Sequence, residues 1–245
     1  MTHGRAALHA AAAALMLAAV AQERVASAVM AGLGGAEKPP VPTDRLLDLA
    51  LRHAALSLVS VAVAAVAALA LAVLVTRSLG AALRPLVDTL VAGLQAVPPV
   101  VVVALAFPAL GFGAAPTILA LVFYCVMPIL RGTVAAIEAT PAEVKEAARA
   151  MGFTRWQLIC EVELPLALPQ IAEAVRLALV LAIATAAVGA LAGAATLGTP
   201  IITGLQNQNE LQILQGAAAT AALAFAAEAL WLVILHRIET RRPDA

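Results

Sequence analysis

The sequence is poor in charged and aromatic side chains. Charged residues make up 12% and aromatic residues 3% of its 245 residues, whereas an ordinary soluble domain is about a quarter charged. The formal net charge is zero, so overall charge favours neither nucleic acid nor an acidic substrate as a partner. The two cysteines, Cys125 and Cys160, follow no metal or redox spacing and are expected to be small apolar side chains in packed surroundings.

Motifs for nucleotide binding and catalysis are also absent from the sequence. It contains no G-x-x-x-x-G-K-[ST] phosphate loop, and its two lysines, Lys38 and Lys145, lie in other contexts. The histidines lack the H-E-x-x-H spacing of a metalloprotease, so no metal site is expected. We find no cluster of His, Asp, Glu, Ser or Cys typical of a membrane-embedded enzyme. The chain is therefore expected to be neither an ATPase nor another enzyme.

Long apolar stretches dominate the chain instead. The apolar fraction is 63% and the mean hydropathy is +0.97. A bilayer-crossing helix needs about 20 mostly apolar residues. Six stretches approach that length: Ala6–Ala21, Ala54–Thr76, Leu90–Leu110, Ala114–Leu130, Leu177–Leu197 and Ile213–Leu235. They predict an all-α integral membrane protein with about six spans, an N-terminal one and five core spans.

The first stretch has two interpretations. Arg5 and the small residues Ala19-Val20-Ala21 resemble a cleaved signal peptide, but the apolar run is longer than the usual hydrophobic region, which favours an uncleaved span. Residues 1–45 are thus interpreted as a span or signal-like segment followed by an exported Pro-rich linker, AEKPPVPTD. Residues 46–245 are interpreted as the membrane domain.

The basic residues predict the orientation. Eleven Lys and Arg residues fall on one side if both termini, residues 77–89 and residues 131–176 lie together, and four fall on the other. The positive-inside rule then places both termini and the loop 131–176 in the cytoplasm.

Within that loop, the sequence EAARAMGFTRWQLICEVELP predicts two short helices. Thr140-Pro141-Ala142-Glu143 and Thr154-Arg155-Trp156-Gln157 both match a capping box. Gly152 lies where a helix C-terminus favours a positive φ, and Pro165 is expected to end the second helix. An apolar stripe that includes Trp156 and Ile159 suits either a partner protein or the lipid surface, and spacing alone does not separate the two.

The same loop resembles the EAA loop of ABC-importer permeases. The residues that match are Glu146, Ala147, Ala148, Gly152, Val162, Leu164 and Pro165, with Val162 where isoleucine is commoner. The resemblance implies a type I ABC-importer transmembrane domain. It also implies that this loop, with Trp156 and Ile159, docks on a cytoplasmic subunit that binds the ATP.

The flanking sequences narrow the resemblance to osmoprotectant permeases. The segments 94–113, 116–133, 162–171 and 193–217 are similar to permeases for glycine betaine, choline and carnitine, although GAATLG at 193–198 replaces the usual GAGGLG-like run. The resemblance implies a bacterial cytoplasmic membrane, an extracytoplasmic substrate-binding protein, a second permease chain and surrounding lipid. Another small solute, such as an amino acid, is the alternative cargo.

Three residues are candidates for the translocation path. Phe123 and Tyr124 lie mid-span, although ordinary packing also explains them. Glu228 is the only acid in a late span, where an ionised group is costly, and both a functional role and a structural one inside the helix bundle are open. Glu173 and Arg176, one turn apart, are expected to form an ion pair near a span end.

Overall fold

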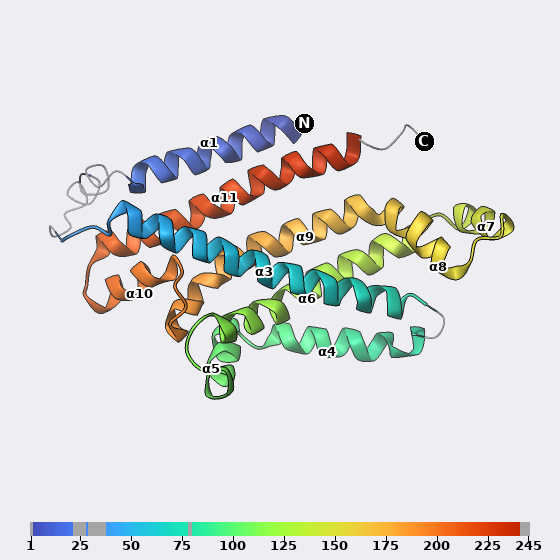
Figure 1. Ribbon diagram of the computed structural model, residues 1–245, viewed down its shortest axis with the longest axis horizontal. Coiled ribbons are helices and arrows are strands. Elements are labelled where there is room, and N and C mark those ends of the chain that lie inside the picture. The colour runs from blue at the N-terminus through green and yellow to red at the C-terminus, as the bar shows by residue number, and fades with distance from the viewer. Residues whose placement is uncertain (1, 22–27, 29–37, 78–79, 241–245) are drawn as a thin grey trace.

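The computed structural model describes residues 2–21, 28, 38–77 and 80–240, and every regular element among them is helical (Figure 1). In chain order the elements are α1 (Thr2–Ala21), α3 (Thr43–Val75), η1 (Ala81–Leu83), α4 (Arg84–Ala96), α5 (Pro99–Leu110), α6 (Ala114–Glu138), α7 (Ala142–Ala150), α8 (Arg155–Gln157), η2 (Leu158–Glu163), α9 (Leu164–Ala186), η3 (Ala187–Ala192), α10 (Gly198–Gln206) and α11 (Glu210–Thr240). The prediction of an all-α membrane protein is confirmed.

Among the described residues, four helical segments are long and apolar enough to cross a membrane: Thr43–Val75, Ala114–Glu138, Arg155–Ala192 and Glu210–Arg237. A fifth span is formed if the bent pair α4 and α5 is counted as one. These five correspond to the predicted core spans. The predicted N-terminal span contains only a shorter apolar helix, Ala6–Met16, within α1. Residues 22–27 and 29–37 lie outside the described residues, and they include only Ala36 and Glu37 of the predicted linker AEKPPVPTD.

The expected span Leu90–Leu110 is not one straight helix. It breaks at Pro98, and the two pieces meet at 92°. Pro98 has an extended backbone (φ −55°, ψ 138°), and Pro99 occupies the first turn of α5. Because proline has no N–H to donate and its ring clashes with the preceding turn, two consecutive prolines end α4 and start a new helix.

Small residues let the central helices α3, α6 and α9 pack closely. Ala64, Ala68 and Ala72 of α3 are fully buried. A Cβ atom on Gly132 of α6 would lie 2.4 Å from the Cβ of Ala174 in α9. In a membrane, where the solvent is as apolar as the side chains, such close packing supplies much of the attraction between helices.

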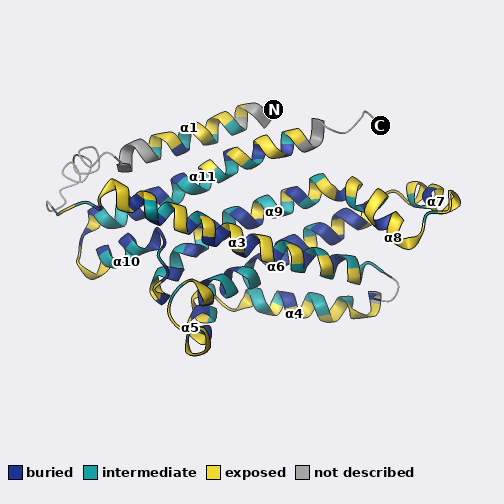
Figure 2. Ribbon diagram, in the orientation of Figure 1, coloured by how far each residue is buried: buried dark blue, intermediate teal, exposed yellow. Residues whose placement is uncertain are grey.

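Large apolar side chains are among the exposed residues on the outside of the bundle, and Figure 2 draws the exposed residues in yellow. On α3, Leu47, Leu51, Leu58, Val63 and Val66 are exposed. A soluble protein would rarely expose so many together. This surface is consistent with a helix that faces lipid or another chain.

His53, in the first third of α3, connects three segments. Its Nε2 lies 2.8 Å from the carbonyl oxygen of Ile183 in α9, and its Nδ1 accepts the backbone N–H of Leu197 at 3.1 Å. This pattern requires a neutral ring with the proton on Nε2. The side chain is fully buried, so His53 fixes the position of the turn between η3 and α10.

Candidate functional site

The hairpin between α6 and α9, residues 140–163, projects from one end of the bundle (Figure 1). In its first helix, α7, the N-cap position is occupied by Pro141 and not by Thr140. The Thr140 hydroxyl is buried and has no hydrogen-bond partner among the residues that the structure describes. The prediction of a capping box at Thr140 is therefore wrong. Because Pro141 has an extended backbone (φ −55°, ψ 140°), the helix starts one residue later than predicted. The start of the helix is then out of reach of that hydroxyl.

Gly152 ends α7 as predicted, with a φ of +86°. The N–H of Gly152 donates to the carbonyl of Arg149 at 3.0 Å, and the N–H of Phe153 donates to that of Ala148 at 3.1 Å. These two bonds define a Schellman motif, in which glycine carries no penalty for its positive φ. The turn therefore depends on residue 152 for its conformation.

Thr154 starts the second helix with a complete capping box. Its hydroxyl accepts the N–H of Gln157 at 3.2 Å, and the Gln157 side chain accepts the N–H of Thr154 at 3.0 Å. This prediction is confirmed.

The helix that starts at Thr154 does not end at Pro165, contrary to the prediction. It continues from α8 through the π-helical turn η2 into α9, where Pro165 lies in the first turn. The N–H of Leu164 bonds to the carbonyl of Ile159, five residues back. We attribute the uninterrupted helix to this wider turn, which accommodates a proline that an ordinary turn would not.

The predicted hairpin residues separate into exposed and buried groups. Trp156 is 68% and Met151 69% exposed, whereas Ala148 and Ile159 are buried. Trp156 and Ile159 thus do not form one exposed stripe. The other predicted positions are exposed (Glu146, Ala147, Gly152, Pro165) or half-buried (Val162, Leu164).

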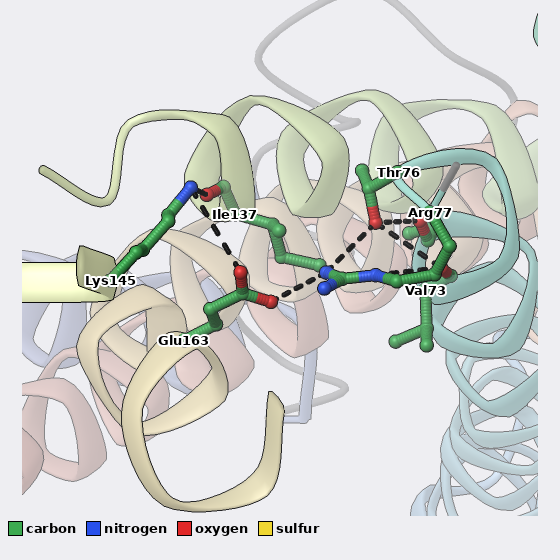
Figure 3. Close-up of polar contacts among 7 residues, drawn as sticks. Val73, Thr76, Arg77, Ile137, Lys145 and Glu163 are labelled. Carbon is green, nitrogen blue, oxygen red and sulfur yellow. Dashed lines mark hydrogen bonds and ion pairs between the residues drawn. The ribbon is translucent and has the colours of Figure 1, made fainter. Parts of the chain in front are cut away.

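Glu163 is the buried polar centre of the hairpin, and it was not among the predicted residues. Its carboxylate accepts a hydrogen bond of 2.5 Å from Arg77, just past the end of α3, and lies 4.0 Å from Nζ of Lys145 on α7 (Figure 3). Lys145 also donates to the carbonyl of Ile137 in α6 at 3.2 Å. One carboxylate therefore joins the hairpin to α3, and through Lys145 to α6.

A cavity of about 540 Å³ lies between the end of α3 and the hairpin. Arg77, Arg149, Arg155 and Trp156 line it together with smaller side chains. In the described part of the chain, Arg149 and Arg155 have no acidic partner within ion-pair distance. This face of the hairpin is basic and carries an exposed aromatic side chain, which are features of a protein-binding surface.

The three candidates for the translocation path are not brought together. Phe123 and Tyr124 lie half-buried on α6. Glu228 on α11 instead forms an ion pair with Arg176 of α9. Arg176 also binds Glu173 at 2.7 Å, so the predicted pair of Glu173 and Arg176 is present.

Residues 64–243 match the family described as the binding-protein-dependent transport system inner membrane component. The chain belongs to this family. Its members are inner-membrane transport components, so the chain is a multi-pass permease subunit and not an enzyme.

Curated members of this permease family cover most of the chain. A carnitine transport permease protein of Listeria monocytogenes is 36% identical over 75% of this chain and 83% of its own length. An osmoprotectant import permease protein of Salmonella typhimurium is 32% identical over 76% of this chain and 78% of its own length. A choline transport system permease protein of Bacillus subtilis is 39% identical over 57% of this chain and 63% of its own length.

Solved structures support the fold of a permease domain. The MetNI methionine ABC transporter in an inward-facing conformation matches with a TM-score of 0.70 at 24% identity, over 79% of this chain and 95% of that chain. An amino acid ABC transporter matches with a TM-score of 0.64 at 18% identity. The fold is that of a type I ABC-importer transmembrane domain, as the sequence predicts.

Proposed function

We propose that this permease carries a quaternary-ammonium osmolyte, such as glycine betaine, choline or carnitine, across the bacterial cytoplasmic membrane. The observation that carries the proposal is the similarity over three quarters of the chain to permeases named for carnitine and osmoprotectants. An amino acid is the alternative cargo, and the curated relatives do not favour it. The likeness to methionine and amino acid transporters is below 25% identity and supports the fold alone.

The hairpin, in this proposal, docks on the cytoplasmic ATP-binding subunit of the importer. Support comes from its sequence resemblance to the EAA loop and from its exposed Trp156 and Met151. Arg149 and Arg155, which form no ion pair within the described part of the chain, favour an acidic counterpart on the ATPase. ATP binding would close two ATPase subunits, and each would move one hairpin.

Glu163 would pass this movement to the membrane helices. Its bonds to Arg77 and Lys145 connect the hairpin to α3 and α6. A displaced hairpin then tilts these spans and alternates access to a central path. Two ATPases require two hairpins, so a second permease chain, identical or similar, completes the transporter around a two-fold axis. Lipid surrounds the remaining apolar faces.

The proposed orientation places the hairpin and both termini in the cytoplasm. Five basic residues belong to the hairpin or to segments at its end of the bundle: Arg77, Arg84, Lys145, Arg149 and Arg155. Basic residues concentrate on the cytoplasmic side of membrane proteins. An extracytoplasmic binding protein would then deliver cargo at the opposite end, near α10.

Purification with native partners tests the function. The chain should co-purify with an ATPase, and reconstituted vesicles should import radiolabelled choline or glycine betaine only with ATP and the binding protein present. Import of methionine in preference to every quaternary-ammonium compound would refute the proposed cargo and favour the alternative.

A further inference from the structure

Gln95 is a polar side chain within the bent span, one residue before the end of α4. The side chain is half-buried, and its Nε2 donates to the backbone carbonyl of Tyr124 in α6 at 2.9 Å. Tyr124 lies near the midpoint of α6, so the bond joins the two helices away from the ends of the bundle. An amide in apolar surroundings is costly unless it is hydrogen-bonded.

The carbonyl that Gln95 binds is one that a proline deprives of its usual donor. In a regular α-helix the N–H of residue 128 would donate to the carbonyl of residue 124. Here residue 128 is Pro128, which lies inside α6 and has no N–H. In a membrane helix such a freed backbone group must find a donor elsewhere in the protein or in water. The side chain of Gln95 is that donor.

The bond lies next to the break in the bent span. Val97 and Pro98, where α4 and α5 meet at 92°, are exposed on the surface of the chain. Non-helical backbone at membrane depth is tolerated where it is covered by protein or lines a water-filled cavity, and transporters commonly bind their cargo at such broken helices. The position of this break is therefore expected to matter for the path.

The bent span is attached to the bundle on both sides of the break. Before it, Gln95 bonds to α6. After α5, the N–H of Gly113 donates to the carbonyl of Ala192 in η3 at 2.7 Å. Between these two points Val103 of α5 belongs to the same apolar cluster as Ala120 of α6. Apolar contacts hold helices together without direction, whereas a hydrogen bond is directional and fixes one register.

We propose that Gln95 is a positioning residue for transport: its bond to the carbonyl that Pro128 frees holds the broken span in register with α6. An amide that only stabilises the fold would determine how many transporters are intact. A positioning amide also determines how much cargo an intact transporter moves for each ATP. The inference goes beyond the proposed function and holds for either cargo, because it concerns the path and not the solute that enters it.

A double-mutant cycle with Pro128 tests the origin of the bond. Gln95→Met keeps the length of the side chain but removes the donor, and it should lower the unfolding midpoint of the purified permease by about 2–4 °C. Pro128→Ala restores an N–H for the carbonyl of Tyr124, so in that background Gln95→Met should shift the midpoint less than half as far. Equal shifts in the two backgrounds would overturn the pairing of Gln95 with the freed carbonyl.

Import per ATP hydrolysed separates positioning from stability. In vesicles that contain the complete transporter, Gln95→Met should lower this ratio about tenfold. The same loss is expected in the Pro128→Ala background, because the carbonyl of Tyr124 has a second lone pair that Gln95 can still use there. Thr89→Val is the matched control: it removes a hydroxyl that bonds within α4, to the carbonyl of Pro85 at 2.7 Å, and should leave the ratio unchanged.

The ratio also decides when a variant is unstable. Loss of folded transporter lowers import and hydrolysis together, so a ratio for Gln95→Met equal to that of the unmodified chain would overturn the positioning role. If Gln95→Met alone does not assemble, its combination with Pro128→Ala, in which the carbonyl of Tyr124 has a donor again, decides in the same way. The ratio is measured with whichever cargo the unmodified transporter imports, so an error in the proposed cargo leaves this test intact.

Discussion

Arg77 and Glu163, separated by 86 residues in the sequence, are joined by a hydrogen bond of 2.5 Å. The carboxylate is buried, and the guanidinium is about a quarter exposed. Breaking a buried ion pair is more costly than its net contribution suggests, because one charge is left without its partner. This pair therefore holds the hairpin rigidly against α3, as the transfer of a mechanical movement requires.

Glu163→Gln should weaken this connection. We expect a loss of on the order of 2 kcal/mol in the free energy of unfolding, since Arg77 and Lys145 keep partial access to water. Transport should fall about tenfold if the hairpin no longer holds one position. Thermal unfolding of the purified complex and uptake by vesicles measure the two effects. Glu161→Gln, an exposed acid two residues away, should change neither.

The two threonines of the hairpin should respond differently to alanine. Thr154→Ala removes a cap and should cost about 1 kcal/mol of helix stability. Fraying of the helix should then speed trypsin cleavage after the neighbouring Arg155, whose side chain is already exposed. Thr140→Ala removes a buried hydroxyl that has no partner and should be neutral or stabilising. The rate of limited trypsin cleavage checks both. Faster cleavage of the Thr140 variant would contradict the assignment of the caps.

His53 and Ser57, one turn apart on α3, form another contrasting pair. His53→Leu leaves the carbonyl of Ile183 and the N–H of Leu197 without partners and should lower stability by about 2–4 kcal/mol. Ser57→Ala removes a buried hydroxyl without a partner and should have little effect. The unfolding midpoint in detergent measures both. An equal loss in the two variants would show that burial alone, and not the hydrogen bonds, makes His53 important.

The sequence predicts the local features of this fold better than the long-range ones. Apolar runs locate the spans, and Gly152 and the Thr154 box are confirmed because short-range backbone chemistry decides them. Glu163 could not be found this way, since its partner Arg77 is adjacent only in the folded chain. An acid within the apolar sequence V-E-L-P was the one available signal.

Prolines at two places in the chain illustrate the same limit. Pro98 and Pro99 break a span that hydropathy alone treats as continuous, whereas Pro165 is accommodated in a helix that proline was expected to end. Neighbouring turns decide between these outcomes: an extended residue precedes α5, and a π-helical turn precedes α9. The residue type alone does not distinguish them.

Gly152 allows the role of the hairpin to be tested without steric disturbance. A Cβ atom at this position would meet nothing within 4 Å, yet φ is +86°. Gly152→Val should therefore act through backbone strain alone. Placing a β-branched residue at this positive φ costs about 1–2 kcal/mol or more. Gly152→Asn, which tolerates a positive φ, should retain most of the activity.

The central claim is that the hairpin couples ATP hydrolysis by the partner subunit to cargo movement. The most direct test is the number of cargo molecules imported per ATP hydrolysed, in vesicles that contain the complete transporter. Gly152→Val should reach the membrane and assemble normally but lose import, whereas Gly152→Asn should keep a ratio close to that of the unmodified chain. Import per ATP by Gly152→Val equal to that of the unmodified chain would contradict the account.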